Sequence, residues 1–135
     1  MFDWMRAEGM RWHTAYEVME RGIAAVVDDV VAAARDFPDH VYLTVDVDSL
    51  DPAFAPGTGT PEPGGLSSRE LLYAIRRIAH ELPLAGMEVV EVSPPYDPAG
   101  ITALVASRCI LEAVSGIALR RAGRAAAPEL SIQVT

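Results

Sequence analysis

Apolar residues recur at helical spacing in two segments of the first two thirds of the chain. Between about residues 17 and 35 an apolar stripe lies opposite polar positions, which predicts a single helix with one face toward the core. The stripe consists of Val18, Ile23, Val26, Val27 and Val30. Ser67, followed three residues later by Glu70, has the spacing of a capping box. It predicts a second helix that runs to about His80.

A third helix is predicted near the end of the chain. Asp97 has the character of an N-cap, with Pro98 in the first turn of the helix, and apolar residues continue to about Arg120. Residues 121–135 are rich in alanine, arginine and proline, so we expect a frayed tail. The predicted domain therefore occupies residues 1–120.

Two segments, 41–47 and 86–92, are rich in β-branched residues and predict strands. Residues 9–13 alternate in the manner of a brief third strand. Strands that alternate with helices indicate an α/β fold with a parallel sheet, right-handed crossovers and helices on both faces. The segment 51–65 between a strand and a helix is dense in proline and glycine, which predicts a long loop of the kind that often carries function.

The composition narrows the function classes. The chain has 135 residues, half of them hydrophobic (50%), which indicates one globular domain. With 11 basic and 19 acidic residues, the net charge of −8 offers no electrostatic footprint for nucleic acid. The lone Cys109 cannot form an internal disulfide, and its apolar neighbours predict a buried, inert thiol.

The sequence shows no membrane-spanning segment and no signal peptide by these criteria. We see no apolar run of the roughly 18 to 20 residues that span a bilayer, and the first residues lack the basic and then apolar order of a signal peptide. We therefore expect a cytoplasmic protein without a membrane partner.

Asp46 and Asp48 are the strongest candidates for chemistry. If the alternation of the strand 41–47 continues through Asp48, the two aspartates project to one side at its carboxyl end, separated by about 6.6 Å of strand rise. Ligands bind at this edge in open α/β folds, and paired carboxylates suit magnesium or manganese. The alternative for Asp48, and for Asp51, is that the residue only initiates a turn. Asp46 is harder to explain in that way, because an unpaired carboxylate inside a strand is costly.

Glu91 stands at the carboxyl end of the second predicted strand. If the strands are parallel, Glu91 opens onto the same crevice as the aspartates, where it could bind a guanidinium-like cation through two hydrogen bonds. The alternative is an ion pair with an arginine. His13, His40 and His80 are scattered along the sequence, and we expect none of them to face a carboxylate in a metal-ligand arrangement.

Two other enzyme classes use paired aspartates. Asp46 and Asp48 could form the nucleophile motif of a haloacid-dehalogenase-like phosphatase, but that fold normally needs a downstream lysine, and this sequence contains none. A glycosyltransferase would need a nucleotide-binding portion before its Asp-x-Asp motif, and none precedes it here. Both alternatives rest on a motif of two acids only.

A longer pattern around these residues is much more specific. Residues 44–66 read TVDVDSLDPAFAPGTGTPEPGGL and resemble the signature of the ureohydrolase family, which includes arginase and agmatinase. Residues 88–97 read EVVEVSPPYD and resemble a second family block, in the form seen in agmatinases. The resemblance covers nearly all of the chain up to about Leu119.

The resemblance implies both a fold and an activity. The fold is a three-layer α/β/α sandwich with a mostly parallel sheet, and the activity is hydrolysis of a guanidino group to urea and an amine with two manganese ions. By resemblance, Asp46 and Asp48 are metal ligands, one of them bridging both ions, and Glu91 binds the substrate guanidinium. The implied substrate is agmatine-like, with putrescine as the amine product.

The family pattern also includes parts that this sequence does not contain. Family members are longer and carry an earlier histidine ligand and an Asp-x-His-x-Asp cluster. We therefore expect the chain to correspond to the C-terminal half of a family domain, with two of six metal ligands. One hypothesis is that the chain is a hydrolase of a small guanidino substrate and forms a homo-oligomer. The other is a catalytically inactive fragment, or an assembly partner that docks on a full-length ureohydrolase subunit.

Overall fold

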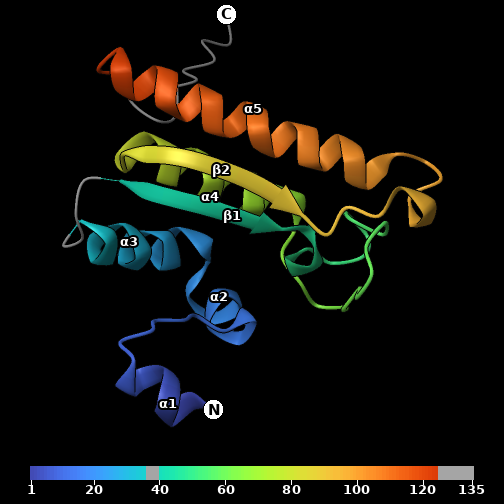
Figure 1. The fold of residues 1–135 in the computed structure, drawn as a ribbon, viewed down its shortest axis with the longest axis horizontal. Helices are drawn as coiled ribbons and strands as arrows, with labels where there is room; N and C mark the ends of the chain where they lie inside the picture. Colours follow the sequence, from blue (N-terminus) through green and yellow to red (C-terminus); the bar gives the residue numbers. More distant parts are fainter. Residues whose placement is uncertain (36–39, 125–135) are drawn as a thin grey trace, which may run out of the picture.

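A computed structural model describes residues 1–35 and 40–124 and contains helices around a short sheet (Figure 1). The elements are α1 (Phe2–Ala7), α2 (Ala15–Arg21), α3 (Ile23–Ala34), β1 (Val41–Asp46), α4 (Ser68–Glu81), β2 (Leu84–Val90) and α5 (Ile101–Arg121). Single turns of 3-10 helix follow the two strands, at Val47–Ser49 and Pro94–Tyr96. Of the predicted tail, only residues 121–124 lie within the described part of the chain.

The two strands are parallel, as the alternation of elements predicted. Asp46 of β1 pairs with Val90 of β2, so both strands end at the same edge of the sheet. Figure 1 shows both arrowheads at the end where the loop 51–65 lies. Residues that directly follow the two strands are thereby brought to one place, which is the arrangement that the candidate site requires.

Only one face of this sheet is covered. Leu43 and Val45 of β1 pack into the main core with residues of α4 and α5. Tyr42 and Thr44 point to the opposite face and are exposed. The prediction of helices on both faces is therefore wrong for the described residues, because α4 and α5, which follow β1 and β2, pack on the same side.

Three predicted elements differ from the structure near the N-terminus and at the sheet. The single helix predicted over 17–35 is two helices, because Gly22 between α2 and α3 adopts φ 79° and ψ 151°, outside the helical region. Residues 9–13 form no strand, since the described sheet has two strands and neither pairs with this segment. β2 begins and ends two residues before the predicted range 86–92, and the chain turns at Glu91.

The start of α4 confirms the local prediction. The Ser67 hydroxyl accepts a hydrogen bond from the Glu70 amide, and the Glu70 carboxylate accepts one from the Ser67 amide at 2.8 Å, which is the reciprocal pattern of a capping box. The helix then runs to Glu81, one residue beyond the predicted end. The capping box therefore fixes the residue at which the loop after β1 ends and α4 begins.

The start of α5 differs from the prediction by several residues. The helix begins at Ile101, with Gly100 as N-cap, so Pro98 lies before the helix rather than in its first turn. Asp97 still supplies the cap chemistry from outside the helix. Its carboxylate accepts hydrogen bonds from the Thr102 amide at 3.1 Å and the Ala103 amide at 2.9 Å. Two of the free amides at the helix start are thus satisfied.

The loop 51–65 is irregular, as predicted, and is tied to the start of α5. The Gly57 amide donates to the Thr102 hydroxyl at 2.8 Å, and the Gly57 carbonyl accepts from the Ser93 amide at 2.8 Å. A Cβ atom on Gly57 would lie 2.3 Å from the Asp97 Cβ, so only glycine fits there. The loop after β1 is therefore fixed against the segment that follows β2.

α5 is the longest helix and crosses α4 closely. It has 21 residues, and its most apolar window of 18 residues has a mean hydropathy of 1.6, so length and composition alone would allow it to cross a membrane. The expectation that no apolar run is long enough is therefore wrong for this helix. In the fold, α5 packs through Cys109, Ala113 and Gly116, and its buried Glu112 forms an ion pair with Arg76 of α4.

We expect Gly116→Ala to destabilise the protein although alanine is the better helix former. The added Cβ would lie 2.7 Å from the Arg76 carbonyl oxygen and 2.9 Å from the Ala79 Cβ. Overpacking of this kind costs about 1 to 3 kcal/mol, which exceeds the helix-propensity gain of about 1 kcal/mol. Urea unfolding measures the change, and Ala118→Gly on the exposed side of α5 calibrates the propensity part. A stabilised Gly116→Ala variant would contradict the close crossing.

We expect Asp97 to make folding sensitive to acid. Hydrogen bonds from the Ala103 amide, and then the Thr102 amide, hold the pKa of Asp97 below its ordinary value. A lowered folded-state pKa gives stability that is present above the unfolded pKa of about 3.9 and is lost as pH falls through the folded value. Asp97→Asn should therefore lower the urea midpoint at pH 6 and change it much less at pH 2. Asp3→Asn, at an exposed site in α1, is the matched control and should leave both midpoints unchanged.

Candidate metal and substrate site

The two candidate metal ligands stand on either side of a tight turn. Asp46 is the last residue of β1, and Asp48 lies in the 3-10 turn that follows. The Asp46 Oδ1 atom accepts a hydrogen bond from the Asp48 amide at 2.8 Å, and the Ser49 hydroxyl donates to the Asp46 carbonyl at 2.6 Å. The strand geometry behind the predicted spacing therefore ends at Asp46, and the turn sets where Asp48 lies.

The Asp48 carboxylate has one occupied and one free oxygen. Its Oδ2 accepts a hydrogen bond from the Thr60 hydroxyl. Its Oδ1 is buried and has no hydrogen-bond partner among the described residues. A buried oxygen without a partner is costly unless a ligand meets it. Because hard divalent cations prefer carboxylate oxygens, this atom and the exposed Asp46 carboxylate fit such an ion.

Asp51 differs from its two neighbours. Its carboxylate accepts hydrogen bonds from the Ala53 and Gly64 amides, both at 2.8 Å. These bonds hold the pKa of Asp51 below its ordinary value. For Asp51 the turn-forming alternative is therefore correct, since both of its oxygens close the loop.

Glu91 directly follows β2 and has a strained backbone. Its φ of 66° is the only positive value at a non-glycine residue in residues 1–35 and 40–124. The Thr58 hydroxyl donates to the Glu91 carbonyl at 3.0 Å and supports this conformation. Strain of this kind costs about 1 to 3 kcal/mol and clusters at functional sites.

The Glu91 side chain is free to meet a ligand. It is exposed, and no arginine pairs with its carboxylate in the part of the chain that the structure describes, so the ion-pair alternative is not seen there. Its Oε2 atom lies 4.0 Å from the position that a Cβ on Gly59 would take. The loop that carries Thr60 beside Asp48 therefore also lies beside Glu91.

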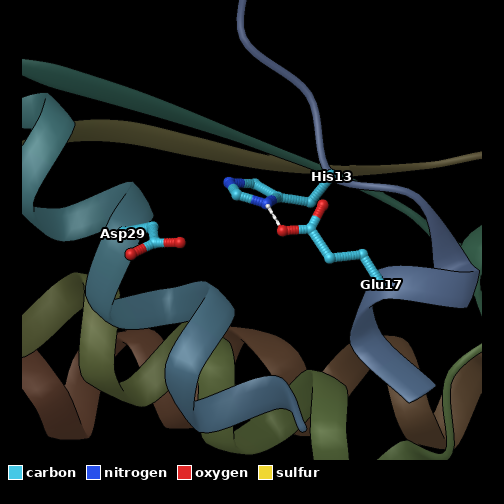
Figure 2. A group of neighbouring side chains, drawn as sticks. All are labelled: His13, Glu17 and Asp29. Atoms are coloured by element: carbon cyan, nitrogen blue, oxygen red, sulfur yellow. Dashed lines mark ion pairs between the residues drawn. The ribbon is translucent and has the colours of Figure 1, made fainter. Parts of the chain in front are cut away.

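A second cluster of possible metal ligands lies near the N-terminus (Figure 2). His13, Glu17 and Asp29 each offer one ligand atom, and these atoms lie within 4.8 Å of one another. The His13 Nδ1 atom is 3.1 Å from the Glu17 Oε1 atom. The expectation that no histidine faces a carboxylate is therefore wrong. The four-residue spacing of His13 and Glu17 was the sequence signal that could have shown it.

One arginine already pairs with both carboxylates of this second cluster. Arg21 forms ion pairs with Glu17 and, at 2.6 Å, with Asp29. Hydrogen bonds from His13, and then from Arg21, keep the pKa of Glu17 below its ordinary value. The carboxylates thus have cationic partners without a metal, and the network joins α2 to α3.

Cys109 behaves as predicted. Its side chain is fully buried between α5 and the core, and burial raises the pKa of the thiol to about 11. A thiol with such a pKa is protonated at neutral pH and is a poor nucleophile. Cys109 is therefore no candidate for a nucleophile.

Comparisons with known proteins identify the family of the chain. Residues 1–116 match the family model described as the arginase family. The chain is 48% identical to proclavaminate amidinohydrolase of Streptomyces clavuligerus over 105 residues, which are 78% of this chain and 33% of that protein. It is 49% identical to an Escherichia coli agmatinase over 98 residues, which are 73% of this chain and 31% of that protein.

The fold comparison gives the same result. A solved structure of proclavaminate amidinohydrolase from Streptomyces clavuligerus superposes with a TM-score of 0.81 and 42% identity, covering 89% of this chain and 39% of that one. The chain thus spans about a third of the length of the curated relatives that it matches. From the family match and the shared arginase-like α/β fold, the chain belongs to the arginase family.

Proposed function

We propose that Asp46, Asp48 and Glu91 belong to a site that hydrolyses the guanidino group of a small agmatine-like substrate with manganese. The observation that carries the proposal is that Asp46, Asp48 and Glu91 all stand where the two paired strands end, with the Asp48 Oδ1 atom buried and without a partner among the described residues. Two sequence relatives of the chain, an agmatinase and an amidinohydrolase, support the proposal by their names.

Asp46 and Asp48 would hold the metal. Asp46 offers an exposed carboxylate and Asp48 a free buried oxygen, a donor set of oxygen atoms that suits manganese. Bound manganese supplies activated water at neutral pH. Two carboxylates are fewer ligands than a pair of ions needs, so we propose that further ligands come from outside the described residues.

Glu91 would bind the substrate. A carboxylate forms two parallel, charge-assisted hydrogen bonds to a guanidinium, which fixes the plane of that group as well as its position. The guanidino carbon would then face the aspartates. Addition of water to this carbon, cleavage of its bond to the alkyl nitrogen and transfer of a proton to that nitrogen yield urea and an amine.

A second function is supported by the uncovered sheet face. Tyr42, 61% exposed, lies on that face with Thr44 and Asp46, although a sheet of this fold class normally has helices on both sides. We propose as the alternative that the chain is catalytically inactive and docks on a ureohydrolase subunit. Activity of the purified chain separates the two functions.

If the chain has the hydrolase function, the purified chain should release urea from agmatine, and only when manganese is added. Asp46→Ala should lower the rate at least roughly 100-fold, because it removes a metal ligand and not just the support of one. Glu91→Gln should raise KM for agmatine, since it removes the charge that binds the guanidinium. Glu88→Gln is the matched control, because Glu88 is an exposed carboxylate of β2 that accepts a hydrogen bond from Thr44.

Each result has a defined meaning. Equal urea release by the wild type and Asp46→Ala would contradict the ligand assignment. If the wild type releases no urea, but binds a full-length ureohydrolase subunit in sedimentation experiments, the docking function is supported in place of catalysis.

A further inference from the structure

One short piece of the loop touches both parts of the candidate site. Residues 57–60 contact the residues that follow β1 and β2. Thr60 donates its hydroxyl hydrogen to Asp48, and Thr58 donates to the Glu91 carbonyl at 3.0 Å. These loop residues are uncharged, and they contact the two residues that carry the negative charge.

The contact with Thr60 determines which Asp48 oxygen is available. Rotation of a carboxylate about its last torsion is soft, so without a partner the two oxygens of Asp48 would exchange places readily. The hydroxyl occupies Oδ2 and leaves Oδ1 buried and without a partner in the described part of the chain. Oδ1 is therefore the oxygen of this carboxylate that is most available to a cation.

Thr60 can hold Asp48 in place because its own segment is firmly fixed. Thr58 is only 3% exposed, and its hydrogen bond ties the segment to the residue after β2. Gly57 is bound to the Thr102 hydroxyl at the start of α5. The loop segment that holds Asp48 is therefore itself hydrogen-bonded to the start of α5.

We infer that Thr60 is a positioning residue that aims the Asp48 Oδ1 atom at a bound divalent cation, an inference that rests on the proposed manganese site. Partners of this kind hold a ligating carboxylate in one orientation, and their loss lowers metal affinity about 10- to 100-fold. Thr60 itself binds neither the metal nor the substrate. Its effect is on affinity and coordination, through Asp48.

Manganese broadening of amide NMR signals in the full 135-residue chain tests the inference without any need for catalysis. Titration with MnCl2 should broaden the amides around Asp48 first and give an apparent Kd. Thr60→Val removes the hydroxyl at nearly constant volume and should raise that Kd about 10- to 100-fold, whereas Thr60→Ser keeps the donor and should restore it. Thr44→Val is the matched control, because it removes a hydroxyl bound to the Glu88 carboxylate at 3.1 Å on the same sheet.

The outcomes separate this inference from the proposed function. If Asp48→Asn abolishes local broadening but Thr60→Val binds manganese like the wild type, the positioning role is wrong and the metal site stands. If manganese does not broaden the wild-type amides around Asp48, both the metal site and the inference are wrong. Equal loss in Thr60→Val and Thr60→Ser would also overturn it, because the hydroxyl would then not be the cause.

Discussion

The backbone of Gly57 lies so close to Asp97 that no side chain fits between them, and the arrangement of the site depends on this contact. On one side of it is the loop that follows β1, and on the other is the start of α5. The Gly57 amide and the Asp97 carboxylate both bind Thr102, one through its hydroxyl and the other through its amide. Because the two chain segments after the strands are joined here, the acids at the two strand ends stay near one another.

Arginine has a structural role across the helices of this acidic chain. Arg76 and Arg108 both pair with Glu112, which is only 5% exposed. Arg77 pairs with Asp28 of α3 and with Glu81 of its own helix. A buried carboxylate needs such partners, because an unpaired charge away from water is costly. These pairs join α4 to α3 and α5, and they leave Asp46, Asp48 and Glu91 as acids without an arginine partner in residues 1–35 and 40–124.

Hydrogen bonding distinguishes three aspartates that look alike in the sequence. Asp51 uses both oxygens to close the loop and Asp46 uses one to cap the turn, whereas one buried oxygen of Asp48 has no partner in residues 1–35 and 40–124. A buried oxygen without a partner is costly unless a ligand binds it, so Asp48 is the aspartate whose environment indicates a ligand. The acids at one sheet edge therefore divide into a structural residue and two candidates for cation binding, and this division follows from their partners and not from their spacing.

The sequence alone determined the features that act between near neighbours. The Ser67 capping box, the β-branched strand before Asp46 and the loop 51–65 were all predictable, because their signals depend on local hydrogen bonds and backbone preferences. The parallel order, which places Glu91 beside the aspartates, followed from the alternation of elements. The tertiary structure decided what depends on distant partners. Residues 9–13 are not a strand because no strand among the described residues pairs with them, and a hydroxyl twelve residues away decides which oxygen of Asp48 accepts a hydrogen bond.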